Sequence, residues 1–203
     1  MRQAGYYGVY YSEQKQSFVV EDTMPGKILV TYASRQGATA GVAEAVGKAI
    51  AESGAEVEVR PMTAVTDLST YDAVVAGSAI QSKAWLPEAM AWVRAHRAEL
   101  NQKPFASFLV CLTLAMKNQA QVEKARPLVA EWLAPVRALV PTRSEGCFSG
   151  VLDLARIPSW SDRIGFRSSV WMGVWDEGDH RDWEAIHQWG AGLAATLRHH
   201  PPA

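Results

Sequence analysis

The feature of this sequence that most constrains its fold is the regular alternation of short apolar runs with longer segments of helical period. The run "KILVTYA" at 27–33 precedes a stretch from 40 to 53 in which Val42, Val46 and Ile50 recur every four residues, as on one face of a helix. Further strand-like runs lie at 53–61, 71–79, 104–112 and 140–153, and helical stretches lie at 86–100, 119–136 and 182–197. Near-continuous apolar strands between helices are typical of a parallel sheet covered on both faces. The sequence therefore predicts an α/β three-layer sandwich whose five parallel strands follow the order 2-1-3-4-5.

The chain divides into three parts by composition. Residues 27–203 are expected to form one domain, because 203 residues suit a single well-buried core. Residues 1–26 are rich in Tyr, Gly and Gln without a steady period, and we expect an extension that is either flexible or a docking arm. Residues 155–180 form an insertion before the last helix. We expect Pro127 to interrupt the helix over 119–136, and Asp182 to cap the last one.

Charge and composition exclude several classes of function. A formal net charge of −1 offers no basic surface for nucleic acid, and the sparse Cys and His residues show no zinc-ligand spacing. Cys111 and Cys147 are either small buried hydrophobes or a disulfide, and so low a cysteine count suits a reducing compartment. The sequence has neither an apolar run of bilayer-spanning length nor a signal-peptide core. We therefore expect a cytoplasmic protein, with peripheral association at the inner face of the cell membrane as a variant.

The loop "SRQGAT" at 34–39 lies between the first strand and the first helix, where a doubly wound sheet binds its ligand. Hydroxyl residues Ser34 and Thr39 bracket Gly37, which allows close backbone approach. Free N–H groups and the helix dipole make such a position an anion site. The loop lacks both the lysine-bearing triphosphate motif and the dinucleotide glycine motif. It is therefore either a monophosphate cradle or a plain capped turn.

Two later loops would form the remaining walls of such a site. The loop "GSAIQSKAW" at 77–85 combines small residues with Trp85, which either stacks on a flat ring or packs in the core. The loop "LTLAMKN" at 112–118 follows the next strand, and its Met116 is either a packing residue or a ligand contact. Both loops end parallel strands, so we expect them to meet at the same edge of the sheet.

With these motifs in view, the segment from "KILVTYASRQGAT" to "YDAVVAGSAIQSKAW" resembles the flavodoxin superfamily, whose first loop binds the phosphate of FMN. More closely, the chain is similar to the short flavodoxin-like, menaquinone-dependent protoporphyrinogen oxidases (protoporphyrinogen IX dehydrogenases of heme biosynthesis) and related flavodoxin-domain proteins. The "SGVLD" strand, the aromatic and basic insertion, and the late "DWEAI" add to the likeness, which covers about 27–198.

The resemblance implies a flavodoxin-like fold and a cofactor-binding set of residues. It places the FMN phosphate on Ser34, Arg35, Gln36, Gly37, Ala38 and Thr39. It places the isoalloxazine ring between Ser78, Ala79, Ile80, Gln81 and Trp85 on one side and Leu112, Thr113, Leu114, Ala115 and Lys117 on the other. Two features depart from the oxidases: Gln81 and Ser82 replace a basic and an aromatic residue, and the insertion is shorter. Both departures lie where a second substrate would bind, so they bear on the identity of that substrate more than on the binding of the flavin.

The insertion 155–180 contains Trp160, Phe166, Trp171 and Trp175 beside Arg156, Arg163 and Arg167. We expect Ile157, Trp160, Ile164, Trp171 and Trp175 to share one helical face. Three interpretations remain open. The insertion shapes a pocket for a flat anionic substrate, lies on a membrane surface, or packs on the sheet edge or a second copy of the chain as a homodimer contact.

Three functions follow from these alternatives. The first is an FMN-dependent oxidoreductase that passes electrons from an organic donor, such as protoporphyrinogen IX, to a quinone, with Arg35, Lys83 and Lys117 as candidate partners for anionic groups. The second is a flavodoxin-type electron-transfer protein, which the weak net charge and the basic insertion disfavour. The third is a flavodoxin-like scaffold that has lost FMN, since the loop lacks the hydroxyl density of "T-x-T-G-x-T".

Overall fold

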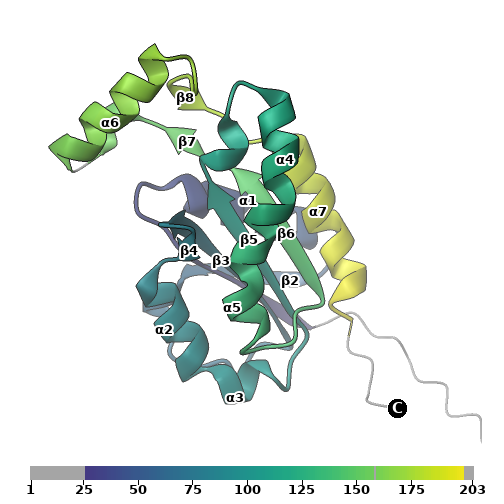
Figure 1. Ribbon diagram of the computed structural model, residues 1–203. Helices are drawn as coiled ribbons and strands as arrows, with labels where there is room; N and C mark the ends of the chain where they lie inside the picture. Colours follow the sequence, from purple (N-terminus) through teal and green to yellow (C-terminus); the bar gives the residue numbers. More distant parts are fainter. Residues whose placement is uncertain (1–25, 158, 199–203) are drawn as a thin grey trace, which may run out of the picture.

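The computed structural model describes residues 26–157 and 159–198, so the N-terminal extension lies outside the described residues. A central sheet holds five parallel strands in the order β2-β1-β3-β5-β6, and the short β4 pairs antiparallel with β3 (Figure 1). The strands are β1 (Lys27–Ala33), β2 (Glu56–Pro61), β3 (Ala73–Gln81), β4 (Ala84–Trp85), β5 (Phe105–Cys111) and β6 (Ser144–Ser149). Counting the parallel strands alone, the predicted order 2-1-3-4-5 is confirmed.

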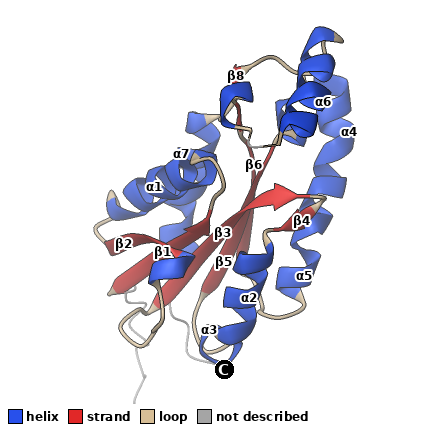
Figure 2. Ribbon diagram, turned by 90° about the vertical axis from the view of Figure 1, so that its left-hand side faces the viewer, coloured by secondary structure: helices blue, strands red, loops and turns tan. Residues whose placement is uncertain are grey.

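Helices cover both faces of the sheet, as predicted (Figure 2). On one face, α1 (Ala38–Ala51) and α7 (Trp183–Thr196) bury Val46 and Ile186 against Ile28 and Val75 of the strands. The other face is covered by α2 (Pro87–Ala95), α3 (Arg97–Leu100), α4 (Gln119–Ala130) and α5 (Ala134–Arg137). A short 3-10 turn at Glu131–Leu133 joins α4 to α5, and two others, Met62–Ala64 and Thr113–Ala115, follow β2 and β5.

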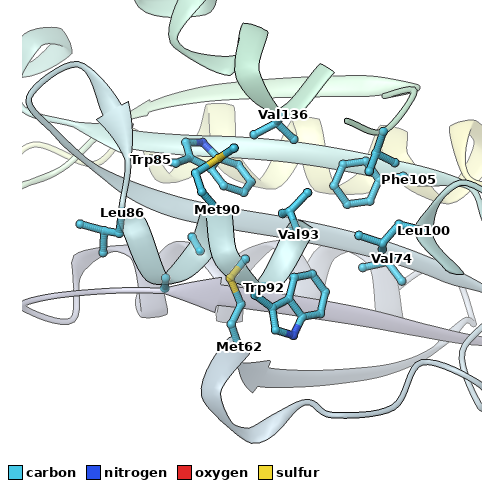
Figure 3. Packing of buried hydrophobic residues seen from close by; sticks show 14 of the residues in the cluster. Met62, Val74, Trp85, Leu86, Met90, Trp92, Val93, Leu100, Phe105 and Val136 are labelled. Carbon is cyan, nitrogen blue, oxygen red and sulfur yellow. The ribbon is translucent and has the colours of Figure 1, made fainter. Parts of the chain in front are cut away.

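The strand sequences explain why two cores form. Successive side chains of a strand point to opposite faces of its sheet. In β1, Leu29 therefore packs into the α2–α5 core, while Ile28 and Val30 pack into the α1–α7 core. All three are fully buried, which is why the run is continuously apolar rather than alternating. Figure 3 shows part of the first core around Trp85, Met90 and Val136.

Two helix predictions need correction. Pro127 lies inside α4, which continues to Ala130, and the break comes instead at the 3-10 turn Glu131–Leu133. Pro127 is exposed and lies in the last turn of α4, so the distortion that a proline causes in a helix comes where the helix is about to end. The helix predicted over 86–100 divides at His96, whose backbone leaves the helical region at φ −96° and ψ 11°. The expected cap is confirmed: Asp182 accepts a 3.0 Å hydrogen bond from the N–H of Ala185.

The insertion forms a separate unit at the carboxyl end of the sheet (Figures 1 and 2). This unit starts before the predicted insertion 155–180, because it begins and ends on a two-stranded antiparallel ladder of β7 (Val151–Leu152) and β8 (Gly178–Asp179). Between them lie a 3-10 turn (Leu154–Arg156) and α6 (Trp160–Trp171). The predicted five-residue face is wrong at both ends, because Ile157 and Trp175 lie outside α6 and are buried or half-buried. Among the described residues, none of the helices has the length and apolar character needed to cross a bilayer.

Candidate functional site

The carboxyl ends of β1, β3, β5 and β6 open onto a cavity of about 670 Å³, which we call the main cleft. This volume lies within the range typical of small-molecule sites. The cleft is lined by Ser34, Arg35, Gln36, Ala38, Thr39, Ala79, Ile80, Gln81, Ser82, Leu86, Val110, Cys111, Leu112, Gly150, Val151, Leu152, Arg156, Ile157, Ser159, Asp162 and Phe166. It is therefore formed by the loops after the parallel strands together with the insertion.

The loop between β1 and α1 forms one end of the main cleft. Gly37 adopts φ +91°, a left-handed conformation that favours glycine, and its N–H donates to Ser34 Oγ at 3.0 Å. Within the described residues, no side chain caps α1, and the first helical bond is from the Gly41 N–H to the Gly37 carbonyl at 3.1 Å. The earlier N–H groups of the first turn are therefore available to a ligand at the positive end of the helix dipole.

Thr39 adds a second donor at the same place. Its side chain is 1% exposed and lines the main cleft, yet among the described residues its Oγ1 has no hydrogen-bond partner. A buried hydroxyl without a partner costs free energy, so such groups in folded proteins normally meet a ligand, water or another side chain. An anionic oxygen in the cleft would satisfy Thr39 and the free N–H groups together. The residues present fit a phosphate group.

Residues of the insertion bind the loop between β1 and α1 through two hydrogen bonds. Gln36 Nε2 donates to the Arg156 carbonyl, and Arg156 Nη1 donates to the Gln36 carbonyl, both at 3.3 Å. Arg156 also pairs with Asp153 at 3.0 Å, and Arg35 pairs with Glu88 at 3.7 Å. The two arginines next to the loop are thus oriented by carboxylates but remain more than half exposed.

Arg181 contacts the start of α1. Its guanidinium donates to both carboxylate oxygens of Asp179, at 2.9 and 2.6 Å, and to the Ala38 carbonyl at 3.4 Å. These contacts hold the pKa of the Asp179 carboxyl below its ordinary value. The guanidinium also lies over the Trp183 ring at 4.2 Å from its centroid. Arg181 therefore joins β8 and α7 to the phosphate end of the cleft.

The opposite end of the main cleft has two largely apolar walls. Ala79 and Ile80, with Gln81 and Ser82, line it from the end of β3, and Val110 to Leu112 line it from the end of β5. Ser82 and Lys83 form the turn to β4 with φ values of +51° and +63°, a conformation that residues other than glycine rarely adopt. Backbone of this kind is often found where a loop is shaped around a ligand.

The structure brings together only part of the predicted cofactor-binding set. Ser34 to Gln36, Ala38 and Thr39 line the main cleft, as do Ala79, Ile80, Gln81 and Leu112. Ser78 is fully buried, and its hydroxyl bonds to the Leu86 N–H and the Ala79 carbonyl. Leu114 packs against the α2–α5 core, and Ala115 is buried. Lys117 pairs with Asp176 at 3.0 Å, outside the cleft.

Trp85 lies in the core rather than in the cleft. It is 3% exposed and packs with Met90 and Val136 (Figure 3). The reason is the hairpin of β3 and β4, which pairs Trp85 with Ile80 and turns the indole inward. The sequence allows either core packing or ring stacking for Trp85, and the structure favours packing.

One wall of the main cleft was predicted only in part. It is formed by Gly150, Val151 and Leu152, which the prediction omits, together with Arg156 and Phe166 of the insertion. The first three had a signal in the sequence, because the last parallel strand ends at the same edge of the sheet as the others. For the insertion, a pocket-forming role is one of the three interpretations that the sequence leaves open, and the positions of Arg156 and Phe166 favour it.

A second cavity of about 670 Å³ adjoins the main cleft, and we call it the side cavity. The two share Ile80, Ser82, Cys111, Leu112 and Phe166. The rest of the side cavity is lined by Lys83, Thr113, Ala125, Leu128, Val129, Glu131, Trp132 and Trp175. Its lining is mainly aliphatic and aromatic, which suits a largely apolar ligand beside whatever occupies the main cleft.

The insertion closes the side cavity through a small set of contacts. Trp175 Nε1 donates to the Leu112 carbonyl at 2.9 Å, and the Lys117 N–H donates to the Val174 carbonyl at 3.1 Å. The rings of Phe166 and Trp175 lie 5.7 Å apart between centroids. Residues far apart in the chain therefore share one wall, which periodicity within a single segment cannot reveal.

Neither cysteine is a ready nucleophile in this site. Both thiols are free, and Cys111 lines both cavities. Burial raises the pKa of Cys111, and burial, together with the nearby Cys111, raises the pKa of Cys147 to about 11. Both groups therefore remain protonated near neutral pH.

A family model described as a flavodoxin domain matches residues 29–181 of the chain. The match spans β1 to the end of the insertion and includes every loop of the main cleft. The chain belongs to this flavodoxin-domain family. No curated protein matches the sequence.

Solved structures share the flavodoxin fold with this chain. A flavodoxin from the domain Archaea superposes with a TM-score of 0.50 at 18% identity, covering 85% of this chain and 99% of that one. The flavodiiron protein from Giardia intestinalis superposes with a TM-score of 0.50 at 16% identity, and the match covers 85% of this chain and 36% of the flavodiiron chain. At these identities the likeness shows the fold alone.

Proposed function

We propose that this flavodoxin-domain protein is an FMN-dependent oxidoreductase that passes electrons from an organic donor to a quinone. The observation that supports FMN most directly is the buried Thr39 hydroxyl beside the start of α1, where the described residues supply neither a hydrogen-bond partner for the hydroxyl nor a side-chain cap for the helix. Thr39, the loop 34–38 and the backbone of the first helical turn would hold the phosphate. Ala79 to Ser82, Val110 to Leu112 and Gly150 to Leu152 would hold the ring system.

Bound FMN would supply the redox chemistry, and the chain would position it and control what reaches it. The ends of β3 and β5 line one end of the cleft largely with apolar side chains, and Phe166 lines it from the insertion. The described residues place no thiol with a lowered pKa at this end, so the protein's own contribution is binding, orientation and access.

The side cavity favours an enzyme over a simple electron carrier. A carrier needs only an exposed cofactor edge, whereas this chain has a second ligand-sized space that shares a wall with the main cleft. Trp132 and Trp175 give it flat apolar surfaces suited to a quinone or a porphyrinogen-like ring. Of the three candidate cations, Arg35 and Lys117 pair with Glu88 and Asp176, while Lys83 has no ion pair within the described part of the chain. Lys83 is therefore our choice for an anionic group of a reactant.

The proposal is tested with purified protein. We expect flavin absorption bands and release of FMN on heating, and rapid reoxidation of the photoreduced protein by the soluble quinone menadione. Leu128→Glu places a charge in the side cavity and should slow that reoxidation at unchanged FMN affinity, while Lys124→Glu on the same helix should not. A protein that binds no FMN contradicts the cofactor assignment. Fast reoxidation that Leu128→Glu leaves unchanged contradicts the role of the side cavity, and slow reoxidation of the wild type favours an electron carrier.

A further inference from the structure

Helix α6 is unusual for a helix of a globular domain because none of its residues, Trp160–Trp171, is buried. Trp160 is 75% exposed, Ile164 57% and Trp171 88%. Met172, directly after the helix, is 63% exposed. Exposed large apolar side chains gathered on one element usually mark an interaction surface.

The exposed apolar side chains form a single stripe. An α-helix turns by about 100° per residue, so Trp160, Ile164 and Trp171 point within an arc of roughly 40°. Arg167 lies about 20° outside this arc, at the edge of the stripe. Among the described residues, Arg167 makes no hydrogen bond or ion pair, so its charge is free.

The other side of α6 faces the protein. Phe166 lines both cavities and contacts the Trp175 ring, while Arg163 Nη2 donates to the Ile157 carbonyl at 2.7 Å. Ser159 caps the helix by accepting from the Asp162 N–H at 3.3 Å. The helix is thus fixed to the domain through one side, and the stripe points away from it. Figures 1 and 2 both place α6 at the outer end of the molecule.

We infer that the stripe docks on a bilayer surface containing anionic lipids, with α6 lying in the plane of the interface. Tryptophan and arginine are the side chains that such an interface accommodates best, because each combines apolar area with a polar group. On α6 itself, Arg163 and Arg167 outnumber the single acidic residue Asp162, and Arg167 lies at the edge of the stripe, which complements a negatively charged surface.

Fully covered, the two tryptophans and the isoleucine would bury roughly 400–600 Å² of apolar surface, since a large aromatic side chain buries about 150–250 Å². One narrow apolar stripe of this size is enough for a helix that lies in the plane of a bilayer interface. A second copy of the chain is the competing occupant, and the oligomeric state measured below tests it. This inference does not depend on FMN and holds for the protein with or without a cofactor.

Vesicle flotation tests the inference. We expect the full chain to float with vesicles of phosphatidylcholine and phosphatidylglycerol in a ratio of about 3:1, with a blue shift of tryptophan emission. The double variant Trp160→Ala/Trp171→Ala should lose at least about tenfold in partitioning, because two side chains of the stripe no longer insert. Trp183→Ala is the matched control, because Trp183 is 45% exposed on α7 and stacks on Arg181.

The charge contribution is tested with a second pair of variants. Arg167→Gln should weaken binding to the anionic vesicles by about fivefold and reduce its salt dependence, since each basic residue near the surface adds to the attraction. Arg94→Gln, on the exposed side of α2, should change neither. Because every substituted side chain is exposed, the far-ultraviolet circular dichroism spectra of all four variants should match the wild type.

Three results would overturn the inference. The first is a wild-type protein that does not float with anionic vesicles. The second is flotation that the double tryptophan variant leaves unchanged. The third is a dimer, measured by light scattering, that the same variant dissociates, which would make the stripe an interface between two copies of the chain.

Discussion

At Thr39, one hydroxyl distinguishes a phosphate site from an ordinary helix start. Thr39→Val keeps the shape of the side chain and removes only the donor and acceptor. A hydrogen bond to a charged group contributes about 1.5–3 kcal/mol, so we expect FMN affinity to fall about ten- to a hundredfold in a fluorescence titration. Thr63→Val, on the exposed turn after β2, serves as the control and should bind FMN like the wild type. Unchanged affinity in Thr39→Val would remove the main support for the phosphate assignment.

Gly77 illustrates a different constraint, which comes from packing rather than from the ligand. A Cβ at this position in β3 would overlap the ring of Phe108 in the neighbouring strand β5. Gly77→Ala should therefore lower the free energy of unfolding by about 1–3 kcal/mol in a urea titration. Gly165→Ala is the matched control, because nothing lies within 4 Å of its built Cβ and alanine favours a helix over glycine by about 1 kcal/mol. Equal destabilisation of both variants would contradict this packing explanation.

The two thiols give a pH-dependent prediction. With the pKa of Cys147 raised to about 11, its thiolate fraction at pH 8 is on the order of one in a thousand. Native protein should therefore react with iodoacetamide much more slowly than urea-denatured protein, and the rate should keep rising as the pH increases to 10. A native rate equal to the denatured one would show that the thiols are not held in their protonated form.

Among the elements, those with local sequence signals were predicted well. The five parallel strands, helix α1 and the cap of α7 follow from runs, periods and a capping aspartate within a few neighbouring residues. The position of Trp85 could not be predicted in this way, because it depends on a hairpin whose turn contains Ser82 and Lys83 rather than the usual glycine. Likewise, Trp175 does not share the helical face that its spacing predicts. It lies outside α6, and its indole N–H donates to the Leu112 carbonyl.

The contact between the insertion and the β5 loop can be measured on its own. Trp175→Phe keeps the aromatic packing with Phe166 but removes the indole N–H that donates to Leu112. We expect faster hydrogen exchange over 159–175 with little change in Tm, because this bond fixes the insertion and not the sheet. Trp171→Phe should leave exchange unchanged, since Trp171 is 88% exposed. Exchange that rises throughout the sheet in Trp175→Phe would instead make the bond part of the global fold.

In the whole molecule, the sheet and its two cores support the site, while the insertion adds residues that shape what can bind there. The sheet and its two cores place the phosphate loop and the apolar walls at one edge, and these parts follow from patterns that the sequence shows openly. The wall formed by Gly150 to Leu152 and Phe166 depends on how the insertion folds back over that edge. Contacts of this kind join distant segments, so they become visible only in three dimensions.

The phosphate end of the main cleft is the centre of the functional proposal, and one comparison tests it most directly. FMN and riboflavin differ only in the phosphate, so the ratio of their Kd values for the wild-type protein isolates its contribution. Two or more charge-assisted hydrogen bonds from Thr39 and the first turn of α1 predict that FMN binds about a hundredfold or more tightly than riboflavin. Equal Kd values would contradict the phosphate site, even if the protein bound both flavins.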